Sequence, residues 1–202
     1  MKKFLCLETF LVAVIIFIAF FANFLTPQDP YLQNLEGALA PPSSQNFLGT
    51  DRYGRDIFSR VIVGSQTTLF ATFLLLITIT TFGTLLGIVA GYFGGKIDLI
   101  LMRLTDLFLS LPQMVFAIAV AGILGGGLFN AAAALAFIGW TKYARLSRSL
   151  VLQITGADFI SSAKISGATS TQIIFKHILP NIVGTILVTA ALDIGTIMME
   201  LA

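Results

Sequence analysis

The sequence predicts an all-α membrane protein that crosses the bilayer several times. Hydrophobic residues make up 56% of the 202-residue chain and charged residues only 11%, with a mean hydropathy of +0.92. Soluble domains carry about 25% charged residues, and a soluble chain this apolar would expose large adhesive surfaces. The apolar residues also lie in runs that approach the roughly 20 residues a spanning helix requires. Together these observations predict a polytopic helical fold.

Five apolar runs are expected to form spanning helices: residues 4–25, 69–92, 107–124, 128–143 and 182–202. The first is longer than the apolar part of a signal peptide and no small-residue cleavage site follows it, so we expect a retained helix. The third begins just before Pro112, which a helix tolerates best in its first turn. The fourth is short but can extend through Leu152. Three glycines, residues 125–127, separate the third run from the fourth.

Basic residues predict the orientation, because cytoplasmic segments of membrane proteins are enriched in Lys and Arg. Residues 140–181 hold five Lys and Arg against the single acid Asp158, and the amino end holds Lys2 and Lys3. Residues 26–66 hold three arginines and four acids. We therefore place the amino end and residues 93–106 and 140–181 inside, and residues 26–66, residues 125–127 and the carboxyl end outside. The predicted division is 1–65, the first helix and outer loop, and 66–202, the membrane core.

Few residues could support catalysis, a metal or a cofactor, and none is expected to do so. The chain has one cysteine, Cys6, and one histidine, His177. One cysteine cannot form a disulfide within the chain, and the two residues are too few for the usual His/Cys zinc sites. A net charge of +2 gives no reason to expect nucleic acid. Residues 91–96 resemble a phosphate-binding loop, but Ala90 and Ile97 stand where that motif needs Gly and Ser or Thr. The segment instead predicts a helix-ending turn.

Residues 48–60, hereafter the charged loop, alternate acidic and basic side chains. Taken alone, they predict a solvated turn whose ion pairs contribute little to stability. The pattern Gly-Thr-Asp-x-x-Gly-Arg-Asp-x-x-Ser-Arg nevertheless resembles a hallmark of permeases in the dipeptide, oligopeptide and nickel branch of ABC importers. Each specified position of that hallmark is matched: Gly49, Thr50, Asp51, Gly54, Arg55, Asp56, Ser59 and Arg60.

Further segments resemble the same permeases, so that the resemblance covers roughly residues 41–202. They are Gly91 to Asp98, then Met102-Arg103, Asp106 and Ser110-x-Pro112, and finally Tyr143-Ala144-Arg145-x-x-Arg148. Taken singly, Arg145 and Arg148 are also explained as side chains that reach the lipid headgroups from a helix end.

Residues 159–181, hereafter the polar segment, form a basic island between the last two apolar runs. It resembles the cytoplasmic coupling loop of these permeases, where Glu-Ala-Ala-x-x-x-Gly precedes a Leu-Pro pair and docks on a separate ATPase. Ser161 and Ser162 replace the first two residues of that pattern, whereas Ala163, Gly167 and Pro180 match it. Small side chains at Ala163 and Gly167 would leave one face open to a partner's groove, with Lys164 beside them to meet an acidic rim. The alternative is an ordinary interfacial amphipathic helix.

Asp193 lies near the centre of the last apolar run. A carboxylate there is costly, so we expect it in a buried interior or facing water. It would either line a translocation path or act as a hydrogen-bonding centre between helices. Glu200 is expected near the outer end of the same helix, within reach of water.

The resemblance implies a non-catalytic, multi-pass permease subunit in the cytoplasmic membrane, with the type I ABC importer fold. The implied partners are a second permease, one or two ABC ATPase subunits and an extracytoplasmic solute-binding protein, besides membrane lipid. The implied solute is nickel or a metal chelate, a dipeptide or an oligopeptide. Residues 163–168 and 192–195 slightly favour the nickel type.

Family members have six spans, and a Ser-Phe-Leu-Gly-Leu-Gly-like loop follows their fifth. Five spans are visible here and the sequence ends before such a loop, so we expect an incomplete permease that is unstable or inactive alone. A proton-coupled carrier or an intramembrane enzyme is the alternative function. A carrier would show an internal repeat and several intramembrane acids, and a protease would need a second aspartate beside Asp193 or a nucleophile with a base.

Overall fold

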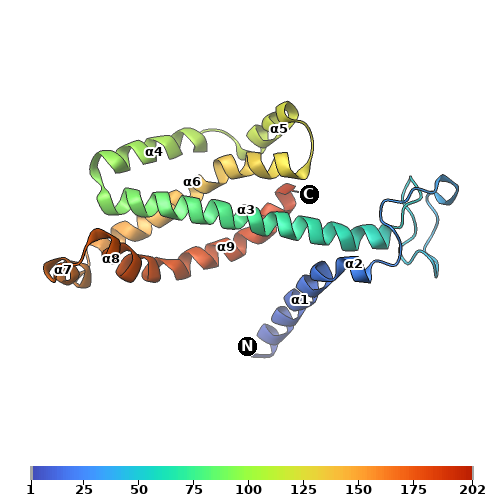
Figure 1. Ribbon diagram of the computed structural model, residues 1–202, viewed down its shortest axis with the longest axis horizontal. Helices are drawn as coiled ribbons and strands as arrows, with labels where there is room; N and C mark the ends of the chain where they lie inside the picture. Colours follow the sequence, from blue (N-terminus) through green and yellow to red (C-terminus); the bar gives the residue numbers. More distant parts are fainter. Residues whose placement is uncertain (1, 202) are drawn as a thin grey trace. The chain divides into compact units, whose positions relative to one another are not determined.

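The computed structural model describes residues 2–201, without the side chains of residues 2–9, 11, 121 and 124. Within that part of the chain the regular elements are helical (Figure 1), apart from one isolated antiparallel bridge between Thr50 and Asp56. The predicted all-α class is confirmed. The chain forms two compact units, Met1–Phe70 and Ala71–Ala202, which are described separately.

The first unit contains α1 (Lys2–Phe20), α2 (Ala22–Leu25), the short 3-10 helix η1 (Leu35–Gly37) and the beginning of α3 (Ile57–Phe93). The predicted first span, residues 4–25, is therefore interrupted at Phe21. The interruption is slight, because the Phe21 amide donates to the Phe17 carbonyl at 3.0 Å and the Leu25 amide to the Phe21 carbonyl at 3.0 Å. Phe20 and Phe24 are 77% and 87% exposed, as expected of side chains that contact lipid.

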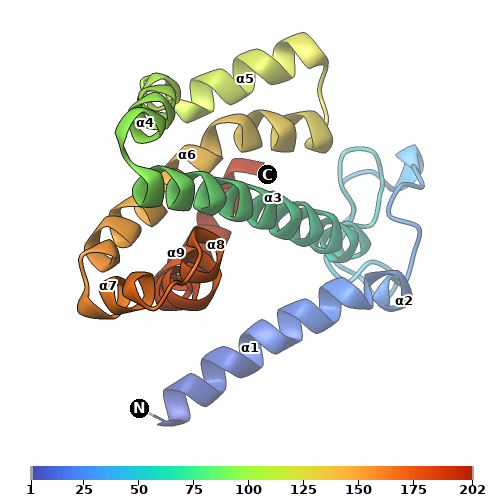
Figure 2. The ribbon, with the colours of Figure 1, turned by 60° about the vertical axis from the view of Figure 1, so that its left-hand side comes forward.

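The second unit is built around a central helix, α6. Its elements after α3 are α4 (Gly95–Leu109), α5 (Gln113–Leu124), α6 (Leu128–Thr155), α7 (Asp158–Ile165), α8 (Ser170–Ile173), the π-helical turn η2 (Ile174–Ile178) and α9 (Leu179–Leu201). Figures 1 and 2 show α4 and α5 on one side of α6 and α9 on the other. The last buried side chains of α6 meet those of α7, η2 and α9 in a common apolar core: Val151, Ile160, Ile178 and Ile182.

Pro112 breaks the predicted third span. The run 107–124 was expected to be one helix with Pro112 in its first turn, but α4 ends at Leu109 and α5 begins at Gln113. The two helices meet at an angle of 78°. Proline has no amide hydrogen to donate and disfavours helical geometry in the residue before it. Pro112 therefore occupies the N-cap position, directly before the first residue of α5.

The fourth predicted span is longer than the run that defined it. Residues 128–143 were assigned to it, with an extension through Leu152, and α6 continues to Thr155. Residues 140–155, counted above as part of an inner loop, are thus helical. Among the described residues, Ile57–Phe93 and Ser170–Leu201 are long and apolar enough to cross a membrane, and the bent α4–α5 pair makes a third if it counts as one span.

Three glycines allow α3 to approach α6 closely. An ideal Cβ atom on Gly87 would lie 1.9 Å from Ser147 Oγ and 2.2 Å from the Ala144 carbonyl oxygen. Gly83 and Gly91 repeat this contact one turn away on either side, against Trp140 and Val151. Small residues at a spacing of four let helix backbones meet in membranes. The spacing of Gly83, Gly87 and Gly91 is visible in the sequence, but the helix that packs against them is not.

Candidate functional site

The charged loop folds as a tight cap on the beginning of α3. Asp56 precedes the first helical residue, and its Oδ2 atom accepts hydrogen bonds from the Ser59 amide at 2.8 Å and the Ser59 hydroxyl at 2.6 Å. A side-chain oxygen in this position satisfies one of the amides that a helix start leaves unpaired. Asp56 and Ser59 are buried, at 3% and 0% exposure. The expectation of a solvated turn is therefore wrong for these two residues.

Asp51 organises the outer part of the charged loop. Its carboxylate accepts from the amides of Tyr53 and Arg55 at 2.8 and 3.1 Å and forms an ion pair with Arg55 at 2.7 Å. Arg60 lies 3.7 Å away. Desolvation opposes ionisation, but the hydrogen bonds from Arg55 and Tyr53 outweigh it and lower the pKa of Asp51 to about 2. The stabilisation by this carboxylate is complete above about pH 4 and is lost as the pH falls toward 2.

Gly49, Thr50 and Gly54 of the hallmark fix the backbone conformation of the charged loop. Gly49 and Gly54 have φ angles of +76° and +72°, which residues with a side chain rarely adopt. A Cβ atom at Gly54 would also lie 1.7 Å from the Asn34 carbonyl oxygen. Thr50 is buried and donates its hydroxyl to the Gly37 carbonyl, while it accepts from the Ala40 amide at 2.8 Å. The hallmark thus builds one folded loop, and its sequence pattern reflects this internal bonding.

The polar segment holds the short helix α7, which ends in a left-handed glycine. The Gly167 amide donates to the Lys164 carbonyl and the Ala168 amide to the Ala163 carbonyl, both at 3.0 Å, and Gly167 has a φ of +84°. This pair of bonds is the Schellman arrangement that ends helices. Space around Gly167 is open, with no atom within 4 Å of an ideal Cβ. Gly167 is therefore exposed and also ends α7 through its left-handed backbone conformation.

The other predicted coupling residues lie on different faces of α7. Ser161, Ser162 and Lys164 are exposed, whereas Ala163 is half-buried against the core. Ile165 is 88% exposed. The Lys164 ammonium lies 5.9 Å from the centre of the Tyr92 ring at the end of α3, which is within cation–π range. The exposed residues of α7 are thus Asp158, Phe159, Ser161, Ser162, Lys164 and Ile165.

Pro180 lies just after the π-helical turn that leads into α9. The Leu179 amide donates to the Ile174 carbonyl, five residues earlier. Proline lacks an amide and its ring clashes with the carbonyl four residues before it, which here belongs to Lys176. The wider turn accommodates that clash. Pro180 is exposed, and its place in the structure is at the entry to the last helix.

Two arginines of α6 pair with acids of α4. Arg148 binds Asp98 in a bidentate manner, with its Nη2 atom 2.6 Å from Oδ2, and Arg145 Nη2 lies 2.7 Å from Asp106. The reading in which these arginines only reach for lipid headgroups is therefore wrong. Both acids belong to the segment that resembled the permeases, so the motif residues of α4 and α6 are partners of one another.

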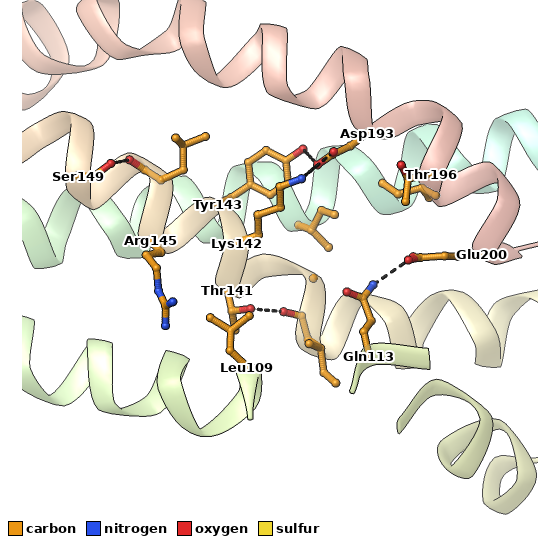
Figure 3. A pocket seen from close by; sticks show the side chains of 15 residues that line it. Leu109, Gln113, Thr141, Lys142, Tyr143, Arg145, Ser149, Asp193, Thr196 and Glu200 are labelled. Atoms are coloured by element: carbon orange, nitrogen blue, oxygen red, sulfur yellow. Dashed lines mark hydrogen bonds and ion pairs between the residues drawn. The ribbon is translucent and has the colours of Figure 1, made fainter. Parts of the chain in front are cut away.

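Asp193 lies in a polar cluster at the interface of α6 and α9 (Figure 3). Its two carboxylate oxygens accept from the Lys142 ammonium at 2.7 and 2.8 Å, and Oδ2 also accepts from the Tyr143 hydroxyl at 2.9 Å. The Asp193 side chain is 16% exposed and that of Lys142 56%. Sequence reasoning missed Lys142 and Tyr143, because they lie 51 and 50 residues away. A lysine inside the extended fourth run was the available signal.

A second polar contact lies two turns further along α9. Figure 3 shows Gln113, at the start of α5, facing Glu200, and its amide nitrogen donates to Glu200 Oε2 at 3.1 Å. Both contacts line one cavity of about 520 Å³, whose wall also includes Leu109, Thr141 and Thr196. Glu200 is half-buried, and its contact with Gln113 is one that the sequence did not predict. The break between α4 and α5 places Leu109 and Gln113 in this wall.

The arrangement offers polar contacts rather than reactive chemistry. Among the described residues no group of three or more His, Cys, Asp and Glu side chains could hold a metal ion. The charged groups at the cavity are already paired across helices. The cavity thus offers charged and hydrogen-bonding groups to a polar molecule, and the ion pairs at its wall join α6 to α4 and α9.

Comparison with known proteins gives a consistent result. Residues 83–202 match the family described as "Binding-protein-dependent transport system inner membrane component". The nickel transport system permease protein NikC of Escherichia coli is 34% identical over 97% of this chain and 71% of its own length. The dipeptide transport system permease protein DppC of Alkalihalophilus pseudofirmus is 40% identical over 93% of this chain and 62% of its own length.

A third relative extends the range of named solutes. The oligopeptide transport system permease protein OppC of Bacillus subtilis is 34% identical over 92% of this chain and 61% of its own length. The chain thus spans about three fifths to seven tenths of these relatives. The resemblance read from the charged loop and the polar segment is confirmed: the chain belongs to the family of binding-protein-dependent transport system inner membrane components.

Proposed function

We propose that this chain belongs to a transmembrane permease subunit of an ATP-driven importer of nickel, metal chelates, dipeptides or oligopeptides. The similarity to permeases over nearly the whole chain carries this proposal. The subunit itself catalyses no reaction. It works with a second permease, one or two ABC ATPase subunits and an extracytoplasmic solute-binding protein. ATP hydrolysis on the partners shifts the permease pair between outward- and inward-facing states.

The position of α7 supports coupling to a separate ATPase. It is an exposed eight-residue helix between the two longest helices of the second unit after α3, namely α6 and α9. Ile160 anchors it in the core with 0% exposure, while Ser161, Ser162 and Ile165 remain free. A helix held on one face and open on the other can transmit the movement of a bound partner to α6 and α9. The coupling residues of the proposal are Ser161, Ser162, Ala163, Lys164, Gly167 and Pro180.

The proposal is tested by measuring uptake of nickel and of dipeptides in cells that lack their own permease. The complete gene product is supplied with its partner subunits. We expect uptake that requires an intact ATPase subunit and persists when a protonophore removes the proton gradient. Uptake that continues without the ATPase and stops with the protonophore would identify a proton-coupled carrier instead.

A further inference from the structure

The Lys142–Asp193 ion pair is placed so that a solute can replace it. Charges inside a membrane protein stay paired, because an uncompensated charge there is strongly unfavourable. The Asp193 side chain is fixed in place, because it is only 16% exposed and also accepts a hydrogen bond from the Tyr143 hydroxyl. The Lys142 side chain is 56% exposed, and its ammonium group stands at the end of a long flexible chain. The lysine can therefore swing away from the aspartate, provided that both charges find new partners.

The cavity beside the pair has room for such a replacement. Its volume of about 520 Å³ falls within the range of roughly 300–1,000 Å³ typical of small-molecule sites. An extended dipeptide is about 7 Å long. The wall near Asp193 is polar on its α9 side, with Thr196 and Glu200 along the same helix (Figure 3). A peptide backbone would find hydrogen-bonding groups there.

The charges of the pair select a solute with two opposite charges. A zwitterion presents an ammonium to Asp193 and a carboxylate to Lys142, so both protein charges remain compensated after the exchange. A bare metal cation that took Asp193 would displace Lys142 and bring no carboxylate of its own to pair with it. No group of three or more His, Cys, Asp and Glu side chains in the described part of the chain could hold a metal ion. The pair thus discriminates between the solute classes that the relatives' names leave open.

We propose that the Lys142–Asp193 pair is an exchange site for zwitterionic short peptides, opened when the peptide termini replace the ion pair between α6 and α9. The proposal rests on the transport function proposed above and makes its solute more specific. It also gives the solute a means to release α6 from α9, because the bond between the helices is the one that the peptide replaces. Tyr143 holds Asp193 in place during the exchange.

The test measures how fast a cysteine at Thr196, a residue of the cavity wall, reacts with N-ethylmaleimide. The complete gene product carries Cys6→Ser and Thr196→Cys and is assembled with its permease and ATPase partners, without binding protein or ATP. The dipeptide Ala-Ala is expected to slow labelling about tenfold at ten times its half-protecting concentration. N-acetyl-Ala-Ala-amide and nickel chloride are expected to give no protection. Equal protection by the neutral peptide, or protection by nickel, would overturn the proposal.

Charge-removing variants sharpen the test. Lys142→Met should shift protection toward the cationic Ala-Ala-amide, and Asp193→Asn toward the anionic N-acetyl-Ala-Ala. Arg148→Met is the matched control, because it breaks an α6 ion pair outside the cavity wall and should keep the preference for Ala-Ala. An unchanged preference in both charge variants would contradict the exchange. If a charge-removing variant fails to fold, the four peptides are compared on the protein that carries only Cys6→Ser and Thr196→Cys. There Ala-Ala should protect best, since an exchange site requires both peptide charges.

This outcome is separable from that of the uptake experiment. ATP-driven import without protection of Thr196→Cys would leave the transport function standing and remove the exchange site. Protection of Thr196→Cys without ATP-driven import would leave the exchange site standing and remove the transport function.

Discussion

At the residue scale, Asp56 determines where the longest helix begins. Its buried carboxylate pairs with the amide and the hydroxyl of Ser59, and the adjacent chain is fixed by Gly49 and Gly54 in left-handed conformations. The hallmark pattern therefore describes a helix cap and the loop that holds it. Asp51 adds an outer layer of hydrogen bonds and ion pairs.

Replacing Asp56 with alanine should weaken this cap. Loss of an N-cap side chain costs about 0.5–2 kcal/mol, and here the buried Ser59 hydroxyl also loses an acceptor. We expect a lower thermal midpoint for the purified protein in detergent, with Asp56→Asn recovering most of it because asparagine also caps helices. The exposed Glu36 supplies a control. Equal midpoints for Asp56→Ala and Glu36→Ala would rule out the cap.

At the element scale, close contact and charge pairing attach the helices to α6. The Gly83, Gly87 and Gly91 series brings α3 against it, Arg145 and Arg148 attach α4, and Lys142 attaches α9. The helices are thus joined by different chemistry on each side. The contact with α3 has no space for adjustment, whereas the Lys142–Asp193 bond can be exchanged.

The glycine contact predicts an unusual response to a single methyl group. Gly87→Ala would place a Cβ atom 1.9 Å from Ser147 Oγ and 2.2 Å from a backbone oxygen, so the helices must separate. We expect a loss of about 1–3 kcal/mol, typical of overpacking, seen as a lower thermal midpoint. Gly184→Ala in α9 is the control, because nothing lies within 4 Å and alanine favours helices over glycine. A Gly87→Ala variant as stable as the control would show that α3 and α6 are not in contact.

The sequence was sufficient for helices that depend on local pattern, and less so for features that depend on distant partners. Apolar run length located α6 and α9, and the glycines at residues 94 and 95 end α3 as expected. The break at Pro112 was missed, because proline fits both a first turn and a helix break and only packing decides. The pairing of Lys142 with Asp193 joins residues 51 apart, which no local pattern reports.

At the scale of the whole molecule, the proposed ATPase-docking helix α7 and the proposed peptide site at Asp193 are separate sites. The exposed α7 and the polar cavity at Asp193 are both connected to α6 and α9, at different places along those helices. A partner that pulls on α7 would act on the same two helices that the Lys142–Asp193 bond joins. We propose that this subunit converts movement of a separate ATPase into movement of the solute.

Uptake per ATP hydrolysed, measured with Ser162→Trp in the complete importer complex, tests that claim most directly. Ser162 is exposed on α7 and has no special backbone conformation, so the bulky side chain should block docking without disturbing the fold. Leu187→Trp, at an exposed site on α9, is the control and should transport normally. We predict that Ser162→Trp inserts in the membrane at normal levels but loses uptake, with ATP hydrolysis no longer coupled to it. Normal ATP-driven uptake by Ser162→Trp would show that α7 does not couple the ATPase to transport.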